Sequence, residues 1–204
     1  MINRITIIFL IFIVSSCSYS YSDNDFYLNK TERSFLNAFK LGDTVYYESS
    51  TKQLDKFLVL GIDSSQKRER GSFMALPAFN RVYISIKHLP FDTFQSISQD
   101  GTTKKTDTIP EQIICISKHP QKKETAYSFQ FKNFFSYSEN GLGNIHSNII
   151  INGQKLTNYF VIKDDFANPD TTYSKIEQLY WTQEDGLVAY KEKNGIYWTK
   201  KSSY

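Results

Sequence analysis

The chain has 204 residues, with 24 lysines and arginines against 21 aspartates and glutamates, and a formal net charge of +3. This near-neutral balance creates no strong field toward polyanions, so the composition gives no reason to expect nucleic-acid binding. Two cysteines cannot supply the disulfide framework of a small secreted scaffold, and the length suits one domain that buries a sizeable core.

The N-terminus has the order of a secretory signal. Arg4 precedes an apolar run over residues 5–14, and two serines follow the run. As a helix, ten residues cover about 15 Å, which is half of the roughly 30 Å hydrocarbon core of a bilayer. A membrane-spanning helix is therefore not expected, and the sequence predicts a cleaved signal over residues 1–16.

The junction after this run, Val14-Ser15-Ser16-Cys17, resembles the lipobox of bacterial lipoproteins, where an apolar residue and two small residues precede an invariant cysteine. The resemblance implies that Cys17 receives the lipid, becomes the mature N-terminus and attaches the chain to the membrane. Each buried methylene contributes about 0.8 kcal/mol, so two or more acyl chains make a stable anchor. Ser18 stands where an aspartate would retain an enteric lipoprotein at the inner membrane, which implies the outer membrane. A plain secreted protein is the alternative.

The next segment predicts a linker and then a short helix. Residues 17–29 are mainly serine, tyrosine, aspartate and asparagine, which is typical of a flexible tether between the lipid and the fold. Residues 30–204 are expected to form a single β-rich domain. Within it, residues 31–39 predict about two helical turns with Phe35, Leu36 and Phe39 on one face. A helix this short must pack on other elements to be stable.

From residue 44 onward the apolar pattern has a period of two, which predicts strands. Residues 44–48 and 56–62 are apolar runs between turn-forming residues. Residues 81–87 and 126–131 alternate cleanly, and the second segment places its three aromatic side chains on one face. Polar stretches over residues 64–71, 96–108 and 135–147 predict long surface loops.

Three glycine turns predict hairpins in the second half of the chain. Asn152-Gly153 and Asn194-Gly195 each separate two apolar runs, and Asn-Gly supplies the positive φ angles of a type I′ turn. Glu184-Asp185-Gly186 predicts a similar turn between them. The last thirty residues therefore predict a meander of three strands.

The expected fold class is mainly β. The pattern predicts an antiparallel meander of about eight to ten strands, forming either a curved half-barrel over the short N-terminal helix or a sandwich. Aromatic residues make up 16% of the chain, which favours a large apolar interior. At strand positions, aromatic side chains are more typical of a core than of a ligand box.

No motif predicts a catalytic residue, a cofactor or a metal ion. His88, His119 and His146 stand apart, without the spacing of zinc ligands. Cys115 lies in the apolar segment 112–116 and has no disulfide partner if Cys17 carries a lipid, so a buried structural thiol is expected. Cys17 is the one site residue that the sequence predicts.

Two segments carry a further resemblance. Residues 39–49 and 176–198, including Leu179-Tyr180-Trp181 and Tyr197-Trp198, are similar to segments of small Gram-negative envelope lipoproteins of unassigned function. The resemblance implies architecture and no activity. The sequence favours a membrane-anchored envelope lipoprotein that acts as a non-enzymatic binding or assembly module toward an envelope protein or an apolar ligand. A periplasmic hydrolase of unrecognised type stays open as the alternative.

Overall fold

The computed structural model describes residues 27–67, 79–89, 94–97, 103–106, 110–118, 124–164 and 175–201. The predicted signal peptide, Cys17, His119 and most of the predicted tether lie outside these residues. In the part of the chain that the structure describes, no helix has both the length and the apolar character needed to cross a membrane.

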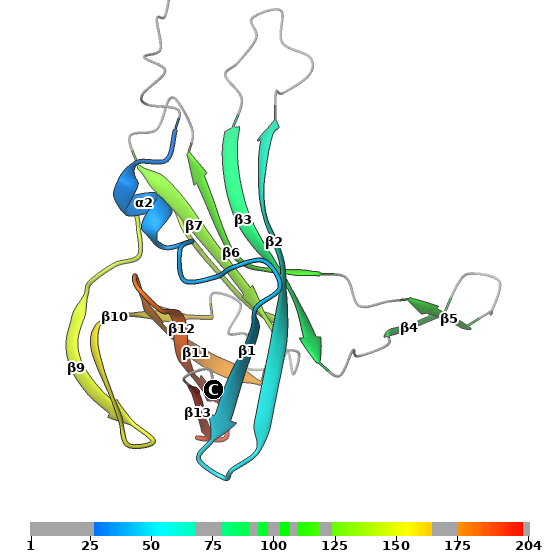
Figure 1. Ribbon diagram of the computed structural model, residues 1–204, viewed down its shortest axis with the longest axis vertical. Coiled ribbons are helices and arrows are strands. Elements are labelled where there is room, and N and C mark those ends of the chain that lie inside the picture. Colours follow the sequence, from blue (N-terminus) through cyan, green and yellow to red (C-terminus); the bar gives the residue numbers. More distant parts are fainter. Residues whose placement is uncertain are drawn as a thin grey trace, which may run out of the picture.

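The described residues form one short helix and thirteen strands. Figure 1 shows how these elements are arranged. Helix α2 spans Lys30–Ser34. The strands are β1 (Thr44–Ser49), β2 (Leu54–Lys67), β3 (Phe79–Leu89), β4 (Phe94–Ile97), β5 (Thr103–Thr106), β6 (Glu111–Lys118), β7 (Thr125–Phe131), β8 (Phe134–Ser138), β9 (His146–Ile151), β10 (Gln154–Lys163), β11 (Ile176–Thr182), β12 (Gly186–Glu192) and β13 (Tyr197–Lys200). The mainly β class with one short N-terminal helix is confirmed.

Eleven strands form a single antiparallel sheet in the order β8-β7-β6-β3-β2-β1-β13-β12-β11-β10-β9. Two meanders meet where β1 pairs with β13, and strands β4 and β5 form a separate two-stranded sheet. The two edge strands, β8 and β9, are consecutive in the chain. The curled sheet, drawn in Figure 1, is a half-barrel with β8 and β9 as its edge strands, which confirms the half-barrel prediction.

Aromatic side chains fill the inside of the half-barrel. The rings of Tyr47, Phe57, Phe131 and Tyr190 pack on one another with centroids 5.2–6.4 Å apart. Phe39 packs on Phe57 of this group and on the fully buried Trp181, which in turn packs on Phe129. The aromatic face predicted for β7 is buried, so these strand aromatics belong to the core as expected.

The segment around α2 closes the open side of the half-barrel. Asn29 caps the helix because its side chain accepts from the Glu32 backbone at 2.8 Å, while the Glu32 carboxylate accepts from the Asn29 backbone at 2.6 Å. The Phe35 ring then lies 5.7 Å from both Tyr127 on β7 and Phe160 on β10. One side chain thus bridges the strands next to the two sheet edges.

This closing segment is seated deeply in the core. Leu28 and Phe39 are buried, and the buried Glu32 carboxylate accepts from the Thr125 hydroxyl of β7. Gly186 has a φ of +71°, and an added Cβ would lie 2.5 Å from the Phe39 ring. Only glycine satisfies both the backbone angle and the contact. The folded part of the chain includes residues 28 and 29, just before the predicted domain boundary.

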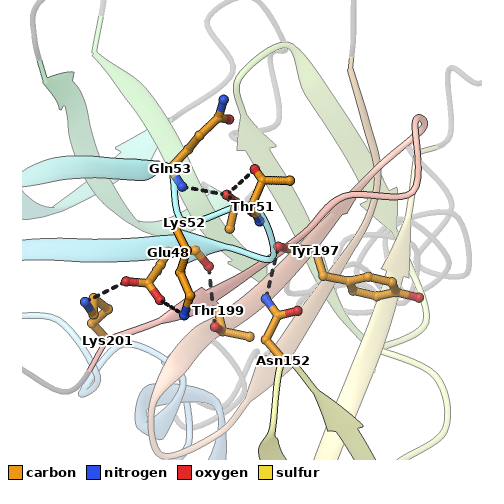
Figure 2. Close-up of polar contacts among 9 residues, drawn as sticks. Glu48, Thr51, Lys52, Gln53, Asn152, Tyr197, Thr199 and Lys201 are labelled. Carbon is orange, nitrogen blue, oxygen red and sulfur yellow. Dashed lines mark hydrogen bonds and ion pairs between the residues drawn. The ribbon is translucent and has the colours of Figure 1, made fainter.

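The β9–β10 hairpin folds back over the outer face of the sheet. Strand β11 pairs with β10 only over Tyr159–Lys163, while β9 pairs with the earlier part of β10. Asn158, at the bend, has a φ of +51°. At the hairpin tip the Asn152 side chain donates to the Tyr197 carbonyl of β13 at 3.1 Å, as Figure 2 shows. The hairpin therefore reaches across β11 and β12 to β13.

A second apolar cluster lies beneath this folded hairpin. On β11, Tyr180 belongs to it, while Leu179 and Trp181 on either side belong to the main core. Successive strand residues point to opposite faces, so the second cluster lies on the other face of the sheet. Its buried members are Ile151, Leu156, Tyr159, Tyr180, Val188 and Ala189. This part of the half-barrel has two layers, as a sandwich does.

The β1–β2 hairpin tip beside the β9–β10 tip is held by charged side chains. The Glu48 carboxylate lies 2.9 Å from Lys52 Nζ and 2.8 Å from Lys201 Nζ, as Figure 2 shows. Hydrogen bonds from Lys201 and Lys52 lower the pKa of Glu48 to about 2. Ser50 N–H also donates to the Tyr197 carbonyl at 2.8 Å, so both hairpin tips meet at the same residue of β13.

The two predicted Asn-Gly turns have different outcomes in the structure. Asn152-Gly153 forms the predicted type I′ turn, with φ angles of 50° and 80°. At Asn194-Gly195, only the glycine has a positive φ, and its N–H donates to the Glu192 carbonyl at 2.9 Å. The prediction of a type I′ turn was wrong there, because five residues, 192–196, lie between the paired residues Lys191 and Tyr197 and a type I′ hairpin has a loop of two.

The predicted loops were also too long. Strand β2 continues to Lys67 and strand β8 covers Phe134–Ser138, although both segments were expected to be loops. In β2, residues 63–65 are exposed, so polar residues there are compatible with strand pairing to β3. A polar composition disfavours burial but does not exclude a strand.

Candidate functional site

A polar groove with a volume of about 660 Å³ lies beside α2, where β10 extends beyond the end of β11. Its walls are the α2 segment, the first half of β10 and the β11–β12 turn. The lining residues are Ser34, Asn37, Ile145, Gln154, Lys155, Leu156, Thr157, Asn158, Phe160, Thr182, Gln183, Glu184, Asp185 and Val188. Small-ligand sites commonly measure roughly 300–1,000 Å³, so the groove has the size of a binding site.

One wall of the groove is a strand edge. Five consecutive residues, 154–158, line it, and successive residues of a strand point to opposite faces. The groove must therefore run along the edge of β10 and not across one face. On its other edge this part of β10 pairs with β9, whereas β11 begins to pair at Tyr159. Within the described ranges, residues 154–157 have no strand partner on the groove side.

Several polar side chains in the groove are uncommitted, which here means that they make no hydrogen bond within the described residues. Asn37, Gln154, Thr157 and Asn158 are exposed. Across the part of the chain that the structure describes, their side chains have no hydrogen-bond partner. Each carboxamide offers both donors and an acceptor. The groove thus presents hydrogen-bonding capacity that folding does not use.

The facing wall is fixed by contacts within the chain. The Thr182 hydroxyl accepts from Asp185 N–H at 3.0 Å, and Lys200 Nζ donates to the Asp185 carbonyl at 2.7 Å. Burial lowers the pKa of Lys200, an effect that Asp185 and Asp43 oppose. The Gln183 side chain donates to the Ser34 hydroxyl, which ties the turn to α2. This wall is consequently a rigid surface.

The groove carries charges of both signs over an apolar floor. Lys155 lies on the β10 wall, while Glu184 and Asp185 lie on the turn. The buried side chains of Leu156 and Val188 form part of the floor. This arrangement suits a ligand that is neutral overall or carries charges of both signs, and it is unsuited to a polyanion.

A second cluster of polar groups lies at the end of the half-barrel where β7 turns into β8. Lys132 Nζ lies 2.6 Å from the Asp55 carboxylate, which also accepts from the Tyr190 hydroxyl at 2.7 Å. The same ammonium lies 5.6–5.9 Å from the ring centroids of Phe131, Tyr190 and Trp198. Burial raises the pKa of Tyr190, and Asp55 raises it further, so the phenol stays a neutral donor. We call this group, with His88 and Glu111, the mouth cluster.

His88 and Glu111 come closest to the acid–base pair that a hydrolase would need. His88 Nε2 lies 3.0 Å from Glu111 Oε2, which also accepts from Lys132 N–H at 2.9 Å. The other ring nitrogen, His88 Nδ1, is buried against the protein without a partner among the described residues. A general base must reach its substrate directly or through one water. The buried nitrogen has no such access.

The structure places three of the residues that the sequence singled out. Cys115 is a buried free thiol on β6, as predicted, and burial raises its pKa. His146 stacks on Tyr159 with a centroid distance of 5.3 Å, and His88 belongs to the mouth cluster. Among the described residues, no three histidine, cysteine, aspartate or glutamate side chains lie close enough to hold a metal ion. Lipidation of Cys17 stays a prediction.

Sequence reasoning missed the groove entirely. Its polar residues come from α2, β10 and the β11–β12 turn, which are far apart in the chain. The one local signal is Asn158, because asparagine adopts the left-handed conformation more readily than most residues and such a residue bends a strand.

Comparison with known protein families, curated proteins and solved structures finds no match to this chain. The likeness to envelope lipoproteins therefore rests on the sequence segments described above. Function must be inferred from the geometry of the site itself.

Proposed function

We propose that the chain is a membrane-anchored envelope lipoprotein whose β-rich domain is a non-enzymatic binding module, with the groove as its binding site. The anchor part of this proposal rests on the N-terminal sequence pattern, with Cys17 as the attachment residue and the outer membrane as the expected location. The binding part rests on the uncommitted polar groups of the groove, which are its single strongest support.

The interior of the half-barrel favours a binding site on the surface. Large side chains such as Tyr47, Phe57 and Trp181 occupy the inside, where the Tyr47 ring packs on Phe57 and the Trp181 ring packs on Phe39. An apolar ligand entering there would have to displace them. The groove needs no such displacement, so we place recognition of an envelope partner in the groove.

The position of the groove agrees with attachment at the N-terminus. Ser34 and Asn37 line the groove and directly follow the region that leads back to Cys17. A flexible tether of about twelve residues has a root-mean-square span of about 20 Å. A domain held in this way would present the groove within a short distance of the membrane surface.

The anchor is tested by Cys17→Ala in the full chain. The wild-type chain is expected to incorporate labelled fatty acid and to fractionate with membranes, because the thiol is the acceptor. The variant is expected to lose the label and to accumulate as unprocessed or soluble protein. Equal labelling of both chains would contradict the anchor.

The binding site is tested by site-specific photocrosslinking in cells. A crosslinking residue at Gln154 in the groove is compared with one at Asn133, which is exposed in the β7–β8 turn. We expect one discrete crosslinked species from position 154 and none from position 133, and we expect Glu184→Lys to weaken it. Identical crosslinks from both positions, or none from position 154, would contradict the binding proposal.

A further inference from the structure

The free edge of β10 indicates what class of ligand the groove takes. Residues 154–157 are paired on one side by β9, and on the groove side they have no strand partner within the described residues. An unpaired strand edge presents alternating N–H and C=O groups that another extended chain can bind. We infer, resting on the function proposed above, that the groove binds an extended peptide segment of a protein partner, which pairs with β10 as an added strand.

The geometry gives such a segment a defined place. β11 ends at Thr182, opposite Tyr159, so beyond this point the space on the free edge of β10 is bounded by the β11–β12 turn and by the α2 segment. In this account the end of β11 leaves room for one more strand on the free edge of β10. Along residues 154–157, the added strand would form the hydrogen-bond ladder that β11 forms with β10 from Tyr159 onward.

The side chains along the groove match a polypeptide. The carboxamides of Asn37, Gln154 and Asn158 each provide a donor and an acceptor, as a peptide group does. Backbone pairing would supply the affinity, and side chains would supply the specificity. The carboxylates of Glu184 and Asp185 favour a basic side chain of the peptide, and Lys155 favours an acidic one.

The floor of the groove suits the other face of the added strand. Leu156 and Val188 are buried apolar side chains, and Ile145 at the rim is 62% exposed. Side chains of an added strand alternate between two faces, so one face would contact this apolar floor. The predicted ligand therefore alternates apolar residues with polar ones and carries charges of both signs.

The test uses the full chain, purified in detergent with its own N-terminus. Fluorescence anisotropy measures binding to a positional-scanning library of acetylated heptapeptide amides. We expect selection of apolar residues at alternate positions and of a basic residue at one position between them. If no heptapeptide pool binds above the detergent-only background, the inference is overturned.

Backbone pairing is tested with a modified peptide. The best heptapeptide is compared with two versions that carry N-methyl groups on alternate residues, one for each edge of the peptide. We expect one version to bind at least about tenfold more weakly, because it cannot donate to β10, and the other to bind like the parent. Equal binding of all three peptides would show that side chains alone are recognised and would overturn strand addition.

Matched asparagine variants locate the site. Asn158 and Asn133 both have positive φ, at 51° and 63°, so Asn158→Gly and Asn133→Gly each keep the backbone favourable. We expect Asn158→Gly and Gln154→Ala to weaken peptide binding about fivefold or more, and Asn133→Gly to leave it unchanged. Equal effects at positions 158 and 133 would overturn the assignment.

A neutral sugar distinguishes failure of this inference from failure of the proposed function. Tri-N-acetylchitotriose offers amide and hydroxyl groups without a polypeptide backbone. If this sugar binds the groove and no peptide pool does, the peptide class is overturned while a binding function remains. The crosslinking comparison of positions 154 and 133 tests the binding function separately.

Discussion

The groove and the mouth cluster are both polar, but they use their polar groups differently. In the mouth cluster, Asp55 accepts from both Lys132 and Tyr190, and Glu111 accepts from both His88 and a backbone N–H. In the groove, the carboxamides of Gln154 and Asn158 have no partner among the described residues. Polar groups that are paired inside the chain contribute to folding, whereas unpaired groups that line a groove are available to a ligand. Pairing within the chain therefore distinguishes structural polar residues from candidate binding residues more clearly than their charge or burial does.

The largest expected effect is a loss of stability when the mouth cluster is broken. Asp55→Ala leaves the Lys132 ammonium and the Tyr190 hydroxyl without their shared acceptor at a site where the Asp55 side chain is only 11% exposed. We expect the free energy of unfolding to fall by about 3 kcal/mol. Urea unfolding followed by tryptophan fluorescence measures the change.

The matched control for this prediction is Glu184→Ala in the groove. Glu184 is exposed and uses no partner within the described part of the chain, so its removal should change stability by less than about 0.5 kcal/mol. Similar losses from both substitutions would contradict the contrast between the two regions.

A smaller loss of stability is expected at Gly186, where the groove wall is held by close packing on Phe39 and not by polar contacts. Gly186 and Gly153 have similar φ angles of 71° and 80°, but only at Gly186 would a Cβ meet the Phe39 ring, at 2.5 Å. We expect Gly186→Ala to destabilise the protein by about 2 kcal/mol more than Gly153→Ala does. The same denaturant titration compares the two variants, and equal losses would mean that the Phe39 segment does not pack tightly on this turn.

The smallest effect is the pH dependence due to Glu48. Hydrogen bonds from Lys201 and Lys52 lower its pKa from 4.5 to about 2, so its ionised form is favoured in the folded state. The stabilisation is complete above the unfolded pKa and disappears as the pH falls from about 4.5 to about 2. The difference in stability between wild type and Glu48→Gln should therefore shrink as the pH falls through this range. Thermal unfolding of both proteins at several pH values measures the difference. A gap that is independent of pH would contradict the pairing.

The sequence predicted the fold class because its signals are local. Alternation along β3 and β7, and the Asn152-Gly153 turn, depend on neighbouring residues that one chain segment contains. The pairing of β1 with β13 depends on contacts across most of the chain, and no local pattern specifies it. The half-barrel was therefore one of two predicted alternatives until the strand order was known.

The candidate site could not be predicted for the same reason. Asp55, Lys132 and Tyr190 come together only through the strand order, as do the groove residues from α2, β10 and the β11–β12 turn. Cys17 is the opposite case, because its predicted lipidation depends on a short sequence motif and on no contact within the fold.

Hydrogen exchange at the β10 edge tests the central claim most directly. Within residues 154–157, the account predicts that the N–H groups facing the groove exchange rapidly in the free protein, while those facing β9 and those paired with β11 are protected. Saturation with the selected heptapeptide should slow the groove-facing amides and leave other exposed amides unchanged. Protection of all these amides in the free protein, or no change when the peptide binds, would contradict the claim that β10 offers an open edge to an added strand.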